Sequence, residues 1–509
     1  MGPYDGRMST TSPTTLDPRP DRRPLPADEP GGVLSGRYRA LTLGIVSVVL
    51  LLAFEATAVN TAMPVAARRL DGLGLYAFAF SGYFTTTLFA LVVSGQWCDR
   101  RGPMRPLFTG IAVFAAGLVV AGTAPGMWVF VAGRAVQGLG GGLVIVALYV
   151  VVGRAYPERL RPAVFAAFSS AWVLPSIVGP VVAGAVTQHL GWRWVFLAVP
   201  VLVVLPLAVM GPALRRTAGA APTEGRPGSD PAAPGVPADR HRAALAAMAA
   251  LGAGLLQYAG QRFDLLGLLP GVAGAALLLP AVIRLLPAGT LRAVRGLPTV
   301  ILLRGLAAGA FFAAEAFIPL MMVTRRGLSP TLAGLTLTSG GLSWALGSWL
   351  QGRPGAERYR EAMIRVGFLL TAVAIAGAAL VLLPAVPAWA AAVAWAVGGI
   401  GMGLAVASVS VLMMKLSTPE DAGANSASLQ MSDALGNVLL VGLAGVLFSA
   451  LGGGALAGAG DGAVAGAPGA GTTGAFAVIF LTMTGVALLG ALLSGRTRPR
   501  GAGVPVGAA

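Results

Sequence analysis

The chain has 509 residues, of which 56% are hydrophobic and 11% are charged, and its mean hydropathy is +0.77. A soluble protein of this length would carry about a quarter of charged residues, so the composition excludes that class. The net charge of +16 would suit a nucleic-acid partner, but the basic residues follow a membrane topology instead, as shown below.

Residues that usually bind metals or carry out catalysis are few. Cys98 is the one cysteine, so no intramolecular disulfide forms, and His189 and His241 lie in predicted loops. The sequence contains no metal-ligand cluster, no Ser-His-Asp arrangement and no phosphate-binding P-loop. We therefore expect no metal, no cofactor and no direct coupling to ATP.

Fourteen apolar segments are long enough to cross a bilayer, whose core of about 30 Å needs about 20 helical residues. They predict an all-α polytopic membrane protein. The seventh is the weakest, being rich in Ala and Gly; if it and the eighth pack at the surface, twelve spans remain. The predicted spans are 40–63, 76–97, 107–123, 127–151, 164–187, 194–213, 243–260, 265–287, 297–322, 331–350, 362–384, 387–414, 428–451 and 473–494.

Polar stretches rich in Pro or Gly divide the chain. The N-terminal stretch lacks the apolar run of a secretory signal peptide, and the stretch at 452–471 is typical of a flexible loop. The predicted division is a disordered cytoplasmic tail at 1–39, a six-helix bundle at 40–213, a cytoplasmic linker at 214–242, two inserted helices at 243–287, a second six-helix bundle at 288–494 and a cytoplasmic tail at 495–509.

The basic residues give the orientation of the spans. With both termini inside the cell, 28 of the 36 Lys and Arg residues fall on the cytoplasmic side, counting Arg284 and Arg365 at the inner ends of their spans, and six fall in outer segments. Arg134 and Arg304 lie within spans. Cytoplasmic loops carry such an excess, so we expect a multi-pass protein of the plasma membrane with both termini in the cytoplasm. Its surroundings are then the lipid bilayer, and a nucleic-acid partner is not expected.

The first span carries an acid within FEATAVNTAMP, residues 54–64. Glu55 lies about 12 Å from the predicted outer edge, at 1.5 Å per residue. An acid at this depth is costly and usually faces a cavity or a partner. Glu55 is predicted either to act in transport or to be a neutral group bonded to a neighbouring helix.

A short charged loop, GQWCDRRGPMR, is predicted at 95–105, between the second and third spans. Its charges would lie at a membrane face, and its glycines would let two helices turn back closely. It is either a gating element or simply a positively charged turn. The residues concerned are Gly95, Asp99, Arg100, Arg101, Gly102 and Arg105.

The fourth span contains FVAGRAVQGLGGG, residues 130–142. A buried Arg134 needs acceptors or a counter-ion, and Gln137 lies one helical turn away. Gly138 permits close helix approach. The span is predicted to be a packing face anchored by Arg134, a part of a proton relay, or both.

The fifth span contains PSIVGPVVAG, residues 175–184. Gly179, Pro180 and Gly184 predict a helix with a kink at the proline and a face of small residues that packs closely on a neighbour.

The second half offers two further acids and a repeat. Glu315 lies about 10 Å from the outer edge of the ninth span. Asp433 lies near the inner start of its span and is predicted to be an interfacial or helix N-terminal acid. The string GSWLQGRPG at 347–355 echoes the charged loop of the first half, which suggests repeated halves around a central site.

The charged loop resembles the cytoplasmic loop motif of the major facilitator superfamily, G-x-L-x-D-R-x-G-R-x-R, with departures at Trp97 and Pro103. Residues 54–64 resemble the L-D-x-T-V-V-N-V-A-L-P stretch of fourteen-span drug:proton antiporters in that superfamily. Asn60 is in place, and Glu55 replaces Asp.

Further strings resemble motifs of the same superfamily. The string after Arg134 resembles R-x-x-Q-G-x-G, and the fifth span resembles G-x-x-x-G-P-x-x-G-G with Pro175 and Ala183 in place of glycines. WRWVF at 192–196 and the segment 315–334 resemble the fourteen-span group. The resemblance covers the chain from about residue 40 to 494.

The resemblance implies a secondary active transporter with two six-helix bundles that alternate access to a central cavity. We expect export of a small hydrophobic or amphiphilic molecule in exchange for protons by a monomer. A symporter or uniporter of another solute is the alternative on the same fold, and a membrane enzyme or a scaffold is the alternative from another class. The expected coupling or cavity residues are Glu55, Asn60, Arg134, Gln137 and Glu315.

Glu55 and Arg134 lie at similar depths, about 12 and 10 Å from the outer edge. The resemblance places their spans in one bundle, so the two side chains are expected to meet. If they part during the cycle, Glu55 would bind a proton in one state and release it in the other. Glu315 is the alternative coupling acid.

Overall fold

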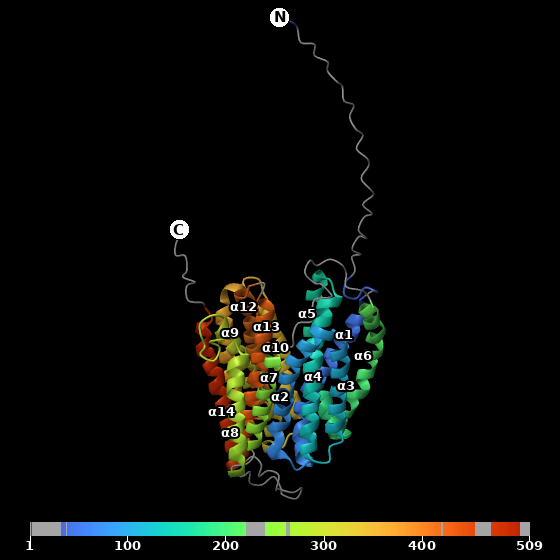
Figure 1. The fold of residues 1–509 in the computed structure, drawn as a ribbon. Coiled ribbons are helices and arrows are strands. Elements are labelled where there is room, and N and C mark those ends of the chain that lie inside the picture. Colours follow the sequence, from blue (N-terminus) through green and yellow to red (C-terminus); the bar gives the residue numbers. More distant parts are fainter. Residues whose placement is uncertain are drawn as a thin grey trace.

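The computed structural model describes residues 2, 32–36, 38–219, 240–260, 265–418, 421–452 and 470–498 (Figure 1). This part of the chain is helical throughout. Its long helices are α1 (Arg39–Arg69), α2 (Tyr76–Arg101), α3 (Met104–Gly122), α4 (Met127–Ala155), α5 (Arg161–His189), α6 (Arg193–Gly219), α7 (Arg240–Ala259), α8 (Leu265–Leu285), α9 (Leu297–Arg325), α10 (Pro330–Gln351), α11 (Arg360–Leu380), α12 (Ala390–Leu416), α13 (Ala422–Ala450) and α14 (Ala470–Leu493).

Each of the fourteen predicted spans corresponds to one of these helices, and the prediction of an all-α polytopic membrane protein is confirmed. Among the described residues, eleven helices are long and apolar enough to cross a membrane. Helix α6 adds a shorter apolar stretch, Arg193–Ala208, whereas α7 and α10 fall outside this group. The weakness predicted for the seventh segment is therefore visible in the helix that it forms.

The predicted loop at 95–105 is wrong in its extent. Helix α2 continues through Arg101, and only Gly102 and Pro103 separate it from α3. Gly102 has φ +74° and ψ 168°, a conformation that strongly favours glycine. Gly95 lies inside α2, and a Cβ atom added there would meet no atom within 4 Å. The close turn therefore depends on Gly102 and not on Gly95.

Two other helix limits differ from prediction. Helix α6 continues to Gly219 and α7 begins at Arg240, so both ends of the predicted linker 214–242 are helical. Helix α13 begins at Ala422, six residues before the predicted span. Most of the predicted tails, the middle of the linker and most of the predicted loop 452–471 lie outside the described residues.

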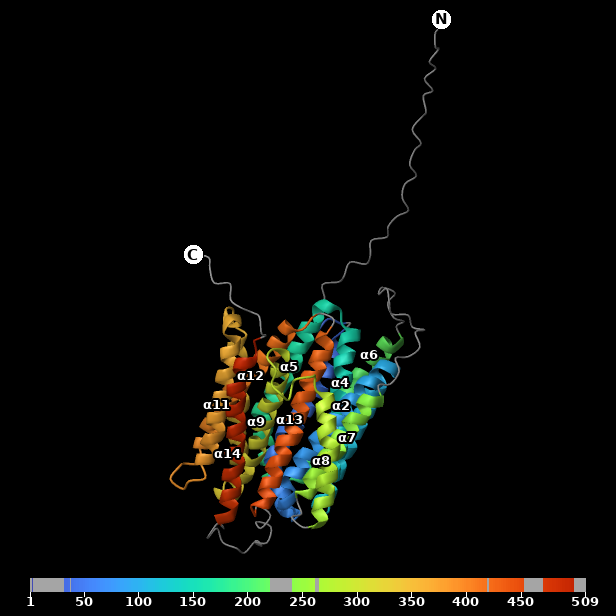
Figure 2. The ribbon, with the colours of Figure 1, turned by 60° about the vertical axis from the view of Figure 1, so that its left-hand side comes forward.

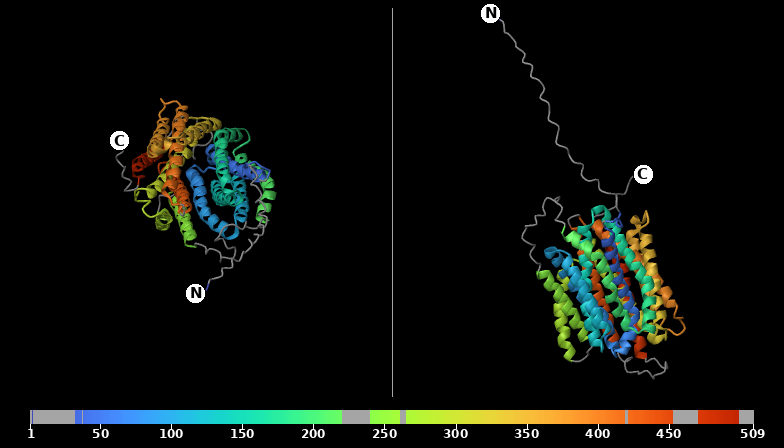
Figure 3. Two further views of the ribbon diagram at one scale, coloured as in Figure 1. Left: turned by 90° about the horizontal axis from the view of Figure 1, so that it is seen from above. Right: turned by 90° about the vertical axis from the view of Figure 1, so that its right-hand side faces the viewer.

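The helices pack in two groups with a pair of helices beside them (Figures 2 and 3). In the first group, α4 packs on α2 and α3, and α1 packs on α5 and α6. In the second group, α12 packs on α10 and α11, α9 packs on α13, and α14 packs on α9 and α11. Helices α7 and α8 pack on each other, and α7 contacts α2 and α13, one helix of each group.

We call the end of the molecule where α1 begins the Arg39 end, and the opposite end, where α1 finishes, the Arg69 end. The two groups are joined from their middle to the Arg69 end. The Tyr76 hydroxyl donates to the Ala316 carbonyl at 2.7 Å, and the Ser449 hydroxyl donates to the Gly74 carbonyl at 3.1 Å. Helices α5 and α10 meet along the same half. In Figure 1 the ribbons of α5 and α10 diverge towards the Arg39 end, which is uppermost.

Glycines bring the helices of the second group close together. A Cβ atom on Gly436 of α13 would lie 2.0 Å from the Gly305 carbonyl oxygen of α9, and one on Gly309 would lie 2.4 Å from the Gly436 carbonyl oxygen. Helices in a membrane gain little from the hydrophobic effect on packing together, so such close backbone contact supplies much of the attraction.

We expect Gly436→Leu to lower the melting temperature of the purified protein, because overpacking a close contact costs about 1–3 kcal/mol. The matched control is Gly485→Leu on α14, where an added Cβ meets no atom within 4 Å. Thermal unfolding in one detergent compares the two variants. Equal stability of both would contradict the close crossing of α9 and α13.

Candidate functional site

A buried ion pair joins α1 to α4 in the first group. Arg134 Nη1 lies 2.5 Å from Glu55 Oε1, and it also donates to Gln137 Oε1 at 2.6 Å. The three residues are 3%, 1% and 0% exposed, respectively. Gln137 follows Arg134 by three residues on α4, so both lie on one helix face. The structure thus brings three of the predicted site residues into one cluster.

Tyr83 of α2 is a fourth member of this cluster, which sequence reasoning missed. The Arg134 guanidinium carbon lies 4.6 Å from the centroid of the Tyr83 ring. An arginine over an aromatic face is attracted by the negative π-surface, and more strongly where water is excluded. The position of Tyr83 could not be found from spacing alone, because it lies on a different helix.

Several polar atoms of the cluster have spare bonding capacity. Among the described residues, Glu55 Oε2, Arg134 Nε and Gln137 Nε2 have no hydrogen-bond partner. Leaving a buried polar atom without a hydrogen-bond partner costs about 1–3 kcal/mol. The cluster can therefore accept a further polar group, or rearrange, without breaking a fully satisfied network.

A second contact joins the two groups of helices. Asn60 Nδ2 of α1 donates to Glu315 Oε1 of α9 at 3.0 Å. Both were predicted site residues, but their meeting was not predicted. Within the described part of the chain, Glu315 forms no ion pair. Its partner is a neutral amide, in contrast to the Arg134 partner of Glu55.

The prediction that Asp433 is a helix N-terminal acid is wrong. Asp433 is not at the start of its helix, because α13 begins at Ala422. Its carboxylate lies 2.5 Å from Arg304 Nε of α9, and Asn437 Nδ2 also donates to it at 3.4 Å. An intramembrane arginine stabilises the acid at this depth. The sequence did signal the pair, since Arg304 and Asp433 both fall within predicted spans.

The predicted gating residues lie at the Arg39 end of α2 and the start of α3. Asp99, Arg100, Arg101 and Arg105 are exposed, and in the described residues Asp99 forms no ion pair. Beside the turn, Arg154 of α4 donates to the Cys98 carbonyl at 3.4 Å. The structure therefore does not bring Asp99 into contact with the arginines of its own loop.

The small residues of α4 and α5 lie at close helix crossings. A Cβ on Gly138 would meet the Tyr83 carbonyl oxygen of α2 at 2.2 Å, and one on Gly179 would meet Thr57 Oγ1 of α1 at 2.4 Å. These contacts hold the first group together around the ion pair.

Gly184 and Pro180 lie instead at the junction with the second group. A Cβ on Gly184 would come within 2.5 Å of Thr331 Cα, and the Pro180 carbonyl oxygen would lie 2.6 Å from a Cβ on Gly334. The residues Gly179, Pro180 and Gly184 of α5 therefore allow close contacts both within the first group and with the second group.

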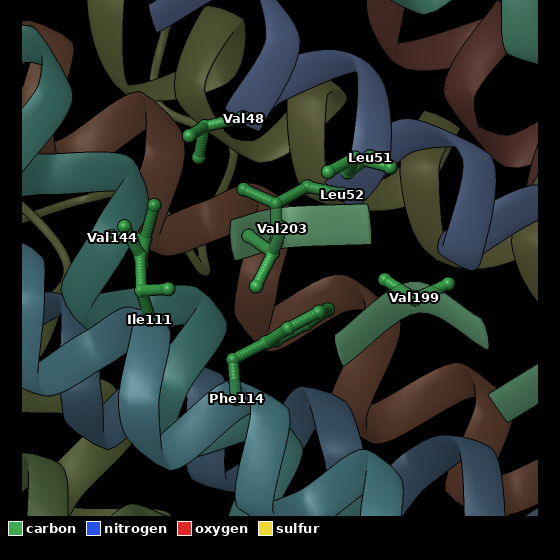
Figure 4. A pocket seen from close by; sticks show the side chains of 8 residues that line it. All are labelled: Val48, Leu51, Leu52, Ile111, Phe114, Val144, Val199 and Val203. Carbon is green, nitrogen blue, oxygen red and sulfur yellow. The ribbon is translucent and has the colours of Figure 1, made fainter. Parts of the chain in front are cut away.

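An apolar hollow of only about 10 Å³ lies among α1, α3, α4 and α6 (Figure 4). Val48, Leu52 and Val203 are among its eight apolar lining residues, and none of the predicted site residues lines it. It offers no polar group for recognition. Among the described residues there is also no group of three His, Cys, Asp or Glu side chains that could hold a metal.

A profile of the Major Facilitator Superfamily matches residues 45–441, which is most of the chain. The chain belongs to the Major Facilitator Superfamily. Members of this superfamily are transporters and not enzymes. The chain is therefore a multi-pass membrane protein of this superfamily of transporters.

The chain spans about a third of the length of the curated relatives it matches. The MFS efflux transporter aclA of Aspergillus oryzae is 31% identical over 189 residues, which are 37% of this chain and 33% of that protein. The multidrug transporter protein MdtP of Bacillus subtilis is 28% identical over 156 residues, 31% of this chain and 29% of that protein.

Solved structures with the same fold include transporters of the POT family. An auto-inhibited member has a TM-score of 0.62 at 16% identity and covers 91% of this chain and 98% of its own. Another member, in complex with 5-aminolevulinic acid, has a TM-score of 0.63 at 14% identity, with 90% and 96% covered. At this identity the likeness shows the fold alone.

We expect Arg134→Met to destabilise the protein by about 3–5 kcal/mol, because it leaves the Glu55 carboxylate buried without a cation. Adding Glu55→Gln removes the uncompensated charge and should restore much of the stability. Melting temperatures of the single and double variants in detergent measure this coupling. If the double variant is as unstable as the sum of its single changes, the two residues do not act as a pair.

Proposed function

We propose that the chain exports a small hydrophobic or amphiphilic compound from the cytoplasm in exchange for protons. The observation that carries this proposal is the buried pair of Glu55 and Arg134. Glu55 can take up a proton, and Arg134 can take the place of that proton as the partner of the carboxylate. The printed names of the relatives, an efflux transporter and a multidrug transporter, support the direction and the substrate class. The antiporter-like stretch at 54–64 supports the coupling ion.

The contacts between the two groups supply the alternating step of this proposal. The groups are held together from their middle to the Arg69 end, where Asn60 bonds Glu315 and Tyr76 bonds the Ala316 carbonyl. Opening at that end must break these bonds, and a new contact at the Arg39 end must replace them. The exposed charges at Asp99 and its neighbouring arginines lie at the end that would then close, which supports a gating role.

Proton exchange at Glu55 would bias this equilibrium. Arg134 stabilises the carboxylate form, so protonation of Glu55 weakens its pairing with α4. The freed guanidinium can then turn to a substrate, to Gln137 or to the Tyr83 face. A ligand shifts two states only by its differential affinity for them, and coupling between two such sites is typically about 1–3 kcal/mol.

We also propose a monomer in the plasma membrane with both termini in the cytoplasm, so that the Arg39 end is the inner one. Two single cysteines on a Cys98→Ser background test this placement. His189→Cys lies at the Arg69 end and Arg292→Cys at the Arg39 end, and both positions are exposed. A membrane-impermeant maleimide should label position 189 in intact cells and position 292 only after permeabilisation. The reverse pattern would overturn the orientation.

We expect Glu55→Gln to uncouple transport, because an amide cannot exchange a proton. Proton-driven uptake into inverted vesicles should fall by roughly tenfold or more, on the scale of a coupling of a few kcal/mol. Counterflow, which needs no gradient, should persist. Glu315→Gln is the parallel test of the alternative coupling acid, which has no cationic partner among the described residues. Full gradient-driven uptake in Glu55→Gln together with its loss in Glu315→Gln would move the coupling role to the second group.

A further inference from the structure

A charged hollow of about 840 Å³, measured with its open mouth, lies at the Arg39 end of the second group. It lies where α11 begins and α12 ends, beside the segment that follows α14. None of the residues discussed for transport lines it. Six charged side chains line it together with the apolar Val411 and Leu412.

Basic residues exceed acidic residues in this hollow. Arg358, Arg360, Lys415 and Arg498 line it together with Glu357 and Glu361, which leaves two positive charges in excess. The excess is not cancelled by pairing, because the Arg498–Glu361 contact at 2.6 Å takes up one charge of each sign.

Of the other three cations, two contact a neighbouring side chain and the third does not. Arg360 donates to Gln351 Oε1 at 3.1 Å, and the Arg358 guanidinium lies 4.7 Å from the centroid of the Tyr359 ring. Lys415 is exposed, and within the described residues it has no hydrogen bond or ion pair.

Lys415 is also the one lysine in a chain whose other basic residues are all arginines. Its ammonium group is a compact charge on a flexible stem with three donors. Such a group suits a phosphate oxygen that approaches from the membrane surface.

Exposed apolar side chains lie on the two helices that frame the hollow. Val411, which lines it, is one helical turn further into α12 than Lys415, and Val366 and Leu369 lie further along α11 than Arg358 and Arg360. On these two helices the cations are therefore nearer the Arg39 end, and the exposed apolar residues are nearer the middle of the membrane. This order matches that of a phospholipid, whose phosphate lies above its acyl chains.

We propose that this hollow binds the headgroup of an anionic phospholipid, with Lys415 and Arg358 contacting the phosphate and the acyl chains lying along α11 and α12. Basic pockets between transmembrane helices on the cytoplasmic side recognise such headgroups. The proposal rests on the membrane placement proposed above and is independent of the substrate and of the coupling ion.

Native mass spectrometry of the full chain in uncharged detergent tests it, with dioleoylphosphatidylglycerol as the probe and the phosphatidylcholine of the same chains as the neutral reference. We expect the phosphatidylglycerol to bind more tightly. The double variant Lys415→Gln/Arg358→Gln should weaken it by roughly 25-fold, at about fivefold for each charge removed at a membrane surface. The control Arg292→Gln/Arg295→Gln removes two exposed charges from the same end, outside the hollow, and should retain the wild-type affinity.

Three outcomes would overturn the proposal. Equal binding of the two lipids shows no recognition of charge, and equal weakening in both double variants shows a general surface effect. Binding of glycerol 3-phosphate as tight as that of the phosphatidylglycerol, and weakened by the same variant, assigns the hollow to a soluble anion instead. Binding in detergent requires no transport, so these outcomes are separate from failure of the proposed exchange.

Discussion

The ion pair between Glu55 and Arg134 is the contact on which the arrangement of the first group depends. Neither charge is tolerable alone in a bilayer, so α1 and α4 must pack with the two residues at one height and facing each other. Asn60 lies five residues further along α1, about 7.5 Å away, and its amide reaches Glu315 in the other group. One helix therefore links the buried pair to the contact between the groups.

Close backbone packing is the condition that allows this pairing. Gly138 brings α2 close enough to α4 for the Tyr83 ring to lie against the Arg134 guanidinium, and Gly179 brings α5 close to α1, the helix that carries Glu55. The same device operates between the groups, where Gly184 faces α10. Large aromatic side chains also meet at this junction, since the Tyr76 ring of α2 lies 5.6 Å from the Phe317 ring of α9.

Hydropathy predicted the helices because it depends only on consecutive residues. Contacts between helices depend on how each helix is rotated about its axis and on which helix lies beside it, and no single segment specifies either. Glu55 and Arg134 were expected to meet, since their depths agree and the family resemblance places their spans together. Asn60 and Glu315 were both predicted site residues, but their contact was not predicted. Nothing in the sequence shows how α1 is placed relative to α9. The charges after Gly95 were interpreted as a loop, although long arginine side chains let a helix run on to the membrane surface.

The two acids differ in what protonation does to their contacts. Arginine has donors only, so a protonated Glu55 loses the charge attraction that holds it to Arg134. Asparagine has both a donor and an acceptor, so Asn60 can serve Glu315 in either state, by giving a hydrogen bond to the carboxylate or accepting one from the acid. Protonation therefore favours separation within the first group and leaves the bond between the groups available. This asymmetry favours Glu55 over Glu315 for the proton-sensitive step that we propose. It also suits the contact of Asn60 with Glu315 to holding the two groups together in either protonation state.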